Sequence, residues 1–110
     1  MSMQRCCPPS EIVERDFEPS AAAFKALADP HRLTILATLA AVNGEVCVCD
    51  FTEALPLNQP AVSHHLRILR DAGFIACQRR GTWVYYRLEP AARERVRAAF
   101  DSVFDQKVFA

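Results

Sequence analysis

The sequence predicts a single, mainly α-helical domain that carries one small β-hairpin. Its 110 residues are 51% hydrophobic and 24% charged, the balance of a globular domain rather than a disordered tail. Most of the chain shows apolar residues at helical spacing between helix-start signals such as Asp29-Pro30. One stretch, residues 74–88, is instead rich in β-branched and aromatic residues around a turn signal. We therefore expect several helices, then a hairpin, then a final helix.

The first 18 residues are expected to form a mobile arm, and residues 19–110 the folded domain. Pro8-Pro9 favours an extended conformation in this arm, which carries Cys6 and Cys7. The N-terminus lacks the apolar core of a signal peptide, and no apolar run approaches the roughly 18 residues of a membrane span. We therefore expect a cytoplasmic protein without membrane contact, whose five cysteines are reactive thiols or metal ligands rather than a disulfide framework.

Two helices are expected after this arm. Residues 21–27 have strong helix propensity. Asp29 then suits an N-cap and Pro30 the first helical position of the next helix. Apolar residues recur at helical spacing up to Asn43-Gly44, which is typical of a helix end. This stretch thus predicts two consecutive helices before the segment that contains the next cysteines.

The segment at residues 46–49 places two thiols two residues apart, just before a third helix. Asp50 followed by Glu53 is a capping-box pattern, which predicts that this helix starts at Asp50. In an extended segment residues i and i+2 point the same way, whereas in a helix they lie about 200° apart. We therefore expect Cys47 and Cys49 to present both sulfurs on one side, near a helix N-terminus that lowers the thiol pKa.

A fourth helix is expected after Pro56, with Asn58 as its N-cap and Pro60 in its first turn. On a helical wheel a narrow apolar stripe is formed by Val62, Leu66 and Leu69. A separate polar face is formed by Ser63, His64 and Arg67, while His65 flanks the apolar stripe and is expected to be structural. Two short helices joined by a tight turn, the second with such a polar face, indicate a DNA-binding helix-turn-helix.

The hairpin is expected to follow this helix directly. Residues 74–78 and 83–88 read as strands, and residues 79–82, Arg-Arg-Gly-Thr, as the turn between them. Such a hairpin makes a wing, whose tip can reach phosphates or the minor groove. Cys77 is expected to point into or beside the core. The order of the elements therefore predicts a winged helix-turn-helix.

The final helix is expected to begin at Glu89-Pro90. It carries an apolar stripe made of Val96, Ala99, Phe100, Val103 and Phe104. So small a fold leaves this stripe few internal partners. We therefore expect a homodimer that forms through the terminal helices.

Charge is unevenly distributed along the chain, although the formal net charge is zero. Residues 59–87 carry five arginines against one aspartate, whereas residues 1–58 are acidic overall. A basic block beside an acidic one can be a footprint for a polyanion, and chance clustering is the alternative. Because the block coincides with the predicted helix-turn-helix and wing, it favours double-stranded DNA as the partner.

Four motifs in collinear order resemble the ArsR/SmtB family of metal- and metalloid-sensing repressors. Residues 24–36, FKALADPHRLTIL, resemble the family's entry motif, and residues 45–51, EVCVCDF, resemble its metal-binding box E-L-C-V-C-D-L. Residues 58–66, NQPAVSHHL, resemble its recognition helix, and residues 81–88, GTWVYYRL, resemble its wing. The resemblance implies a homodimer that binds operator DNA without metal and is released when an ion is captured.

The resemblance also implies which residues contact DNA. On the recognition helix these are Gln59, Ser63, His64 and Arg67, and on the wing Arg79, Arg80 and Thr82. His64 or Arg67 is suited to read a guanine edge, and Ser63 and Gln59 to touch phosphates or bases.

The inducer that the resemblance implies is trivalent arsenic, As(III), with Sb(III) as a close alternative. Arsenic-sensing relatives with this cysteine box carry a third cysteine three residues after the second, where this chain has Thr52. Trivalent arsenic takes three soft thiolates, and Cys47 and Cys49 supply two. Cys6 and Cys7 are the expected source of the third, because the N-terminal arm is long enough to reach the cysteine box of a neighbouring subunit.

Two other kinds of switch stay open, and two are not expected. A site made of all four thiols would suit Cd(II) or Pb(II), and a thiol-redox or persulfide switch would need no metal. The zinc site of other family members is not expected, because residues 90–107 contain no histidine or cysteine. An enzyme is not expected either, since a nucleophilic cysteine needs an aligned base and two of the three histidines belong to the helix-turn-helix.

Overall fold

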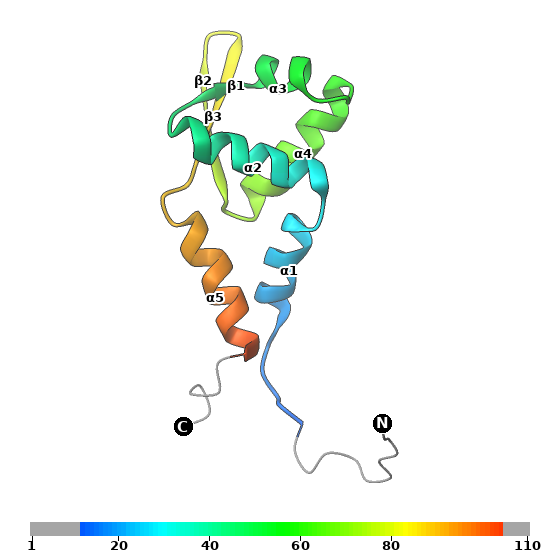
Figure 1. Ribbon diagram of the computed structural model, residues 1–110, viewed down its shortest axis with the longest axis vertical. Coiled ribbons are helices and arrows are strands. Elements are labelled where there is room, and N and C mark those ends of the chain that lie inside the picture. Colours follow the sequence, from blue (N-terminus) through cyan, green and yellow to red (C-terminus); the bar gives the residue numbers. More distant parts are fainter. Residues whose placement is uncertain (1–11, 105–110) are drawn as a thin grey trace.

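The computed structural model describes residues 12–104, which form a mainly α-helical winged helix-turn-helix (Figure 1). In chain order the elements are α1 (Glu18–Leu27), α2 (Pro30–Val42), β1 (Val46–Cys47), α3 (Val48–Ala54), α4 (Gln59–Asp71), β2 (Ile75–Arg80), β3 (Trp83–Leu88) and α5 (Ala92–Phe104). This order confirms the predicted fold class. Within this part of the chain, none of the helices has the length and apolar character needed to traverse a bilayer.

One apolar core joins the helices to the sheet. Its fully buried side chains come mainly from α2, α4 and the start of β2, and they include Ile35, Leu66 and Phe74. The stripe predicted on the fourth helix is confirmed, because Val62, Leu66 and Leu69 have no exposed surface. α1 and α5 pack side by side at one end of the molecule, and the wing extends at the other (Figure 1).

Three helix boundaries follow the capping signals in the sequence. Asp29 caps α2 by accepting hydrogen bonds from the backbone N–H groups of His31 and Arg32 at 2.8 and 3.2 Å. Asn43 ends the same helix in the left-handed conformation, with φ at 55°. Asn58 caps α4 through a 3.0 Å bond from a backbone N–H to its side-chain oxygen. Local side-chain chemistry therefore sets these boundaries.

The sheet has three strands rather than the two of a simple hairpin. β3 lies in the middle and pairs antiparallel with β1 on one side and β2 on the other. β2 continues to Arg80, so the turn is Gly81-Thr82 and the prediction of a turn over residues 79–82 was too wide. Gly81 takes φ 65°, as tight hairpin turns require. Arg79 and Arg80 are consequently strand residues, which point to opposite faces of the sheet.

The third helix begins two residues earlier than its capping-box pattern predicts. α3 starts at Val48, and Cys47 occupies the N-cap position in an extended conformation. Asp50 therefore lies inside the first turn instead of capping it. The prediction was wrong because β1 pairs Cys47 with Tyr85 and ends the extended backbone at that residue.

The apolar stripe predicted on the last helix is divided between the core and the surface. Ala99 is buried, and Val96 packs against the core. Phe100, Val103 and Phe104 remain 54%, 45% and 65% exposed. The inner part of the stripe thus belongs to the core, and the outer part is not covered by any other residue between 12 and 104.

Candidate metal centre and nucleic-acid interface

Cys47 and Cys49 form a pair of thiols at the junction of β1 and α3. Their Sγ atoms lie 2.7 Å apart, and neither belongs to a disulfide. Cys47 is buried, whereas Cys49 is exposed in the first turn of α3. Two sulfurs bound to one ion lie roughly 3.8 Å apart in a tetrahedral site, so a small adjustment lets both bind the same ion. The prediction that both sulfurs lie on one side is confirmed, although Cys49 is helical rather than extended.

The pKa of Cys49 is raised from its ordinary value of 9.0. The hydrogen bond to Cys47 is the main cause, followed by desolvation and by the negative charges of Cys47 and Asp50. The prediction that the helix N-terminus lowers the thiol pKa was therefore wrong for Cys49, because these effects outweigh a backbone hydrogen bond that lowers it. An ion that binds Cys49 as a thiolate has to displace the proton that this thiol donates to Cys47.

The described residues bring no third metal ligand to this pair. Thr52, where the resemblance would place a third cysteine, donates a 3.0 Å hydrogen bond from its hydroxyl to the carbonyl oxygen of Val48. Across residues 12–104, no group of three or more His, Cys, Asp or Glu side chains could hold an ion. Cys6 and Cys7 lie outside that range, so their role as ligands stays a prediction.

The exposed side of the thiol pair borders a cleft of about 490 Å³ that also reaches the helix-turn-helix and the wing. Cys49 and Thr52 line it from α3, Gln59 from the start of α4, and Thr82 and Trp83 from the wing. Two residues that the resemblance assigns to DNA, Gln59 and Thr82, therefore border the same cleft as a candidate ligand thiol.

The polar face of α4 leaves its hydrogen-bonding groups unused, although the His64 ring lies 6.0 Å from the ring of His65. Gln59, His64 and Arg67 are exposed, and Ser63 is half-buried. In the described part of the chain none of these four side chains makes a hydrogen bond or ion pair. The opposite side of the helix carries the buried apolar stripe. This face can therefore offer its donors to a ligand outside the domain.

Arg70 and Cys77 lie beside this face, where sequence reasoning did not place them. Arg70 follows Ser63 and Arg67 at helical spacing, a signal that could have identified it. Its Nη1 atom lies 3.9 Å from Cys77 Sγ, and its Nη2 atom 3.6 Å from Asp71 Oδ1. Cys77 is exposed, which corrects the prediction that it lies in or beside the core. Strand alternation predicts the face of a residue but not where the strand leaves the core.

The two wing arginines have different surroundings. Arg79 is exposed and has no hydrogen bond or ion pair to any residue from 12 to 104. Arg80 donates to both carboxylate oxygens of Glu45, at 2.7 and 2.8 Å, and to the side-chain oxygen of Gln78 at 3.0 Å. The bond to Glu45 raises the pKa of Arg80. Of these two predicted DNA contacts, Arg79 is free and Arg80 is held by the protein itself.

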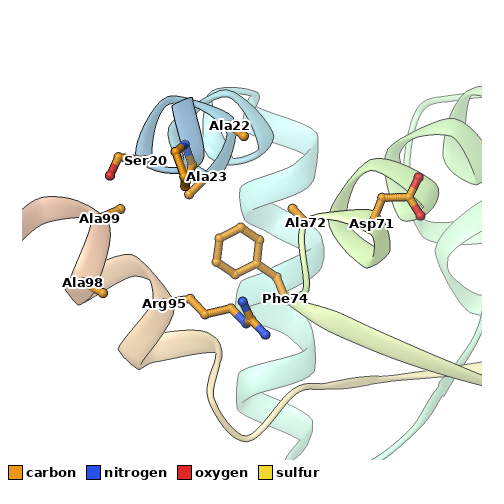
Figure 2. A pocket seen from close by; sticks show the side chains of 10 residues that line it. Ser20, Ala22, Ala23, Asp71, Ala72, Phe74, Arg95, Ala98 and Ala99 are labelled. Carbon is orange, nitrogen blue, oxygen red and sulfur yellow. The ribbon is translucent and has the colours of Figure 1, made fainter. Parts of the chain in front are cut away.

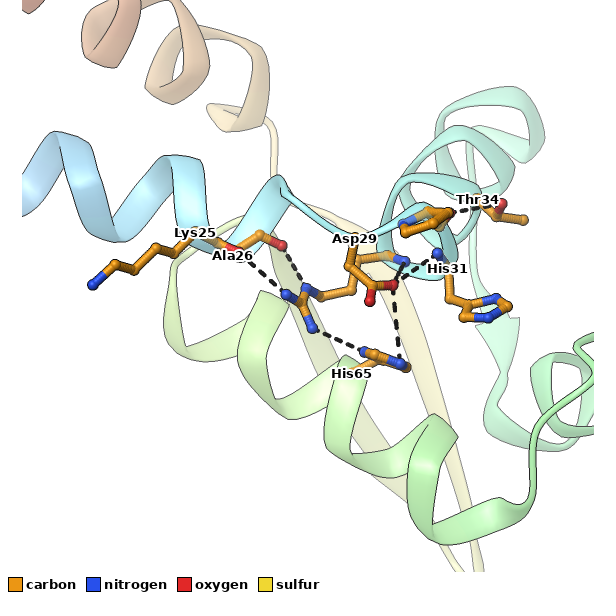
Figure 3. A network of polar contacts seen from close by, with 8 residues as sticks. Lys25, Ala26, Asp29, His31, Thr34 and His65 are labelled. Carbon is orange, nitrogen blue, oxygen red and sulfur yellow. Dashed lines mark hydrogen bonds and ion pairs between the residues drawn. The ribbon is translucent and has the colours of Figure 1, made fainter.

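A polar network ties α4 to the start of α2 (Figure 3). Arg32 Nη1 lies 2.9 Å from His65 Nδ1, and because a guanidinium only donates, we infer that Nδ1 accepts. Arg32 also donates to the carbonyl oxygens of Ala26 and Lys25 at 2.7 and 3.2 Å. Burial lowers the pKa of His65 below its ordinary value of 6.5. The negative charge of Asp29, whose Oδ1 lies 4.0 Å from Nε2, raises this pKa but does not offset the effect of burial. His65 therefore has a structural role, as predicted.

A second cleft, of about 390 Å³, lies between α1, α5 and the end of α4 (Figure 2). Phe74 points into it, between small side chains such as Ala23 and the guanidinium of Arg95 (Figure 2). Gly73 takes φ 85° beside it, where an added Cβ would come within 2.9 Å of Arg95 Cζ. The helices α1 and α5 that line this cleft lie at the opposite end of the domain from the junction of β1 and α3 (Figure 1), so the cleft is separate from the candidate metal centre.

Comparison with protein families matches residues 29–76 to the family described as "Bacterial regulatory protein, arsR family". An "Arsenic resistance transcriptional regulator" from Pseudomonas putida is 48% identical over 82 residues, which cover 74% of this chain and 63% of that protein. An uncharacterised helix-turn-helix transcriptional regulator from Methanocaldococcus jannaschii is 47% identical over 70 residues, which cover 64% of this chain and 78% of that protein. The chain therefore spans less than two thirds of the first relative and more than two thirds of the second.

A solved structure shows the same architecture. The crystal structure of a "Possible transcriptional regulator for arsenical resistance" matches with a TM-score of 0.68 and 31% identity, over 80% of this chain and 90% of that chain. The similarity in fold thus extends well beyond the residues that the family match covers.

Proposed function

Because the chain belongs to the ArsR family of bacterial regulatory proteins, we propose that it is a transcriptional repressor that binds double-stranded operator DNA as a homodimer and is released by trivalent arsenic. The observation that carries this proposal is the position of the thiols. Cys47 and Cys49 bring two sulfurs within 2.7 Å, and Cys49 borders a cleft that Gln59 and Thr82 also line. Such a repressor would act in the cytoplasm and would need no organic cofactor.

DNA binding would use the polar face of α4 and the wing. The free donors of Gln59, Ser63, His64 and Arg67 suit the major groove, where base edges and flanking phosphates are within reach of one helix. Arg79 and Thr82 suit the adjacent backbone or minor groove. In support of this assignment, the side chains of the same four helix residues make no hydrogen bond or ion pair inside the described part of the domain.

The inducer would bind through Cys47, Cys49 and at least one thiol of Cys6 and Cys7. Soft thiolates select a soft ion, and three of them suit trivalent arsenic or antimony. Four would suit Cd(II) or Pb(II) instead. Relatives named for arsenic resistance support the first choice.

Release would follow from differential binding. An inducer can displace DNA only if it binds the DNA-free dimer more tightly than the DNA-bound dimer, and the coupling is reciprocal. The shared cleft supports a short path for this coupling, because an ion at Cys49 lies next to Gln59 and Thr82.

The test measures release of DNA by arsenite, antimonite, Cd(II), Pb(II) and Zn(II). Operator duplexes are first selected from a random pool by the wild-type protein, and release is followed by fluorescence anisotropy. We expect arsenite to release wild type from the operator duplex. Cys47→Ser and Cys49→Ser should each abolish this release, and both variants should keep the DNA affinity of wild type. Losing one of two or three thiolate ligands should weaken ion binding by at least about tenfold.

Cys77→Ser is the matched control, because Cys77 is an exposed thiol of the same chain that lies on β2 and does not line the cleft beside Cys49. It should respond to arsenite as wild type does. Cys6→Ser and Cys7→Ser, singly and together, test the third ligand. Failure of arsenite to release wild type refutes the arsenic assignment, and full release from the Cys6 and Cys7 double variant refutes the participation of the arm.

A thiol-redox switch is the second candidate, and the short distance between the Cys47 and Cys49 sulfurs favours it. In that case an oxidant or persulfide donor would release DNA in the presence of a metal chelator. Release by arsenite but not by these reagents would exclude the redox switch.

A further inference from the structure

Arg80 lies at the end of β2, on the wing, and contacts three other side chains. Its Nη1 and Nη2 atoms donate to the two carboxylate oxygens of Glu45 at 2.7 and 2.8 Å. Nη2 also donates to Gln78 at 3.0 Å, and the guanidinium carbon lies 4.8 Å from the centre of the Tyr85 ring. Arg79, its neighbour in sequence, has none of these partners within the described residues. The end of β2 thus carries one free arginine and one bound arginine side by side.

The pairing of Arg80 with Glu45 depends on the register of the sheet. Cys47 on β1 pairs with Tyr85 on β3, and Tyr85 pairs with Gln78 on β2. Because alternate residues of a strand share a face, Arg80 lies on the face of Gln78, Tyr85 and Cys47. Glu45 stands two residues before Cys47 and reaches that same face, although 35 positions separate it from Arg80.

A carboxylate in this position competes for the groups that a DNA phosphate would use. Carboxylates and phosphates both accept the two parallel N–H bonds of a guanidinium. The Arg80 and Glu45 side chains are 49% and 31% exposed, so solvent and salt screen the attraction between them. A phosphate that approaches the wing can therefore take Arg80, but it has to displace Glu45.

On the premise that the protein binds DNA as proposed above, we infer that Glu45 is an intramolecular competitor of DNA that occupies Arg80 and lowers the affinity of the wing for phosphate. Glu45 is then a positioning residue, because it acts on DNA through Arg80. The competition is independent of DNA sequence, since phosphates are the same at every site. The segment that contains Glu45 also carries Cys47, so the contact between Glu45 and Arg80 connects the candidate inducer site with the wing.

The test is a double-mutant cycle on the full chain, with Glu45→Gln, Arg80→Gln and the double variant. Affinity for a mixed-sequence DNA duplex is measured at salt concentrations between about 50 and 200 mM. We expect Glu45→Gln to bind about two- to fivefold more tightly per protomer, and Arg80→Gln to bind more weakly than wild type. In the Arg80→Gln background, Glu45→Gln should give no further gain.

Arg79→Gln is the matched control, because Arg79 carries the same charge one position away but does not touch Glu45. The gain from Glu45→Gln should persist in this background. Glu45→Ala, which removes the whole carboxyl group, should give the same gain as Glu45→Gln. Because the Arg80 and Glu45 side chains are partly exposed, we expect every variant to fold. Thermal unfolding of each variant checks this.

Equal affinity of wild type and Glu45→Gln overturns the inference. An equal gain in the Arg80→Gln background overturns it too, because the carboxylate would then act only as a general negative charge. The proposed function fails separately, and the inference with it, if wild type binds neither the mixed-sequence duplex nor any selected duplex.

Discussion

His65 links the polar network at the start of α2 to the recognition helix. Arg32 and Asp29 hold its two ring nitrogens, and only the neutral ring can accept the hydrogen bond from Arg32. Burial lowers the pKa of His65 below its ordinary value of 6.5. Folding therefore favours the neutral form of this residue.

Acidification is expected to destabilise the fold through His65. Below about pH 6.5 the unfolded chain binds a proton here more readily than the folded chain, so stability rises with pH in that range. The contribution of neutral His65 to stability is complete above about pH 6.5, and it is lost as the pH falls toward the lower pKa that His65 has in the folded state. Urea unfolding measures the free energy of unfolding at about pH 7.5 and about pH 5.5, and its decrease between them should be larger for wild type than for His65→Gln. The glutamine amide accepts a hydrogen bond but does not titrate. Equal losses in the two proteins would contradict this role.

Three cysteines of the described chain differ because of where the backbone places them. Cys47 is buried at the N-cap of α3, and Cys49 is exposed in the first turn of α3, where it lines a cleft. Cys77 is exposed on β2 beside Arg70. The spacing of Cys47 and Cys49 in the sequence was enough to predict a thiol pair. The surroundings of Cys77 could not be predicted, because they depend on where β2 leaves the core.

At the scale of elements, the helices of the helix-turn-helix depend on local caps. Asn58 accepts the backbone N–H of Ala61 at 3.0 Å and so satisfies one of the free donors at the start of α4. This side-chain cap is exposed, so its contribution can be measured separately from packing in the core.

Removing the cap is expected to destabilise the domain without changing its fold. Asn58→Ala should lower the free energy of unfolding by about 1 kcal/mol, whereas Asn58→Ser, which keeps an acceptor oxygen, should lose only a fraction of this. Urea unfolding measures both variants, and the slope of the transition should stay constant. Equal stability of the alanine and serine variants would mean that Asn58 does not act as a cap.

The start of α3 shows a limit of predicting helix boundaries from local sequence signals. Asp50 and Glu53 form a valid capping pattern, yet the helix begins at Val48. The two-residue strand β1 decides this, because its pairing with β3 holds Cys47 extended and releases the chain into the helix directly afterwards. A strand so short leaves no periodic pattern in the sequence.

At the scale of the whole molecule, α1 and α5 leave an apolar surface at one end of the domain. Phe100 and Phe104 stack with ring centres 4.8 Å apart, and both are more than half exposed. Val103 lies on the same side of α5 and is 45% exposed. An exposed cluster of this kind supports the proposed homodimer through the terminal helices.

Charged substitutions in this cluster are expected to dissociate the dimer. In a two-fold symmetric interface each substitution counts twice, and burying one phenylalanine contributes about 1.5–3 kcal/mol. Phe100→Glu combined with Phe104→Glu should therefore weaken the dimer by at least about 100-fold, as measured by sedimentation equilibrium. Glu94→Lys changes the charge of α5 about 120° around the helix axis from Phe100 and more than one turn before it, and should leave the dimer intact. A monomeric wild type, or a dimer unchanged by the double substitution, would contradict this interface.

Local patterns were sufficient to predict the helices, the apolar stripe of α4, the wing and the pair of thiols. Caps, periodicity and two-residue spacing act between neighbours in the chain, so a sequence displays them directly. Only the tertiary structure decided that β1 joins the sheet, that Cys49 lies within α3, that Cys77 is exposed and that Glu45 binds Arg80. The exposure of Cys77 depends on where β2 leaves the core, and the other three depend on the register between β1 and the β2–β3 hairpin, which are far apart in the chain. Register comes from packing and pairing across the sheet, and no single stretch of this sequence carries it.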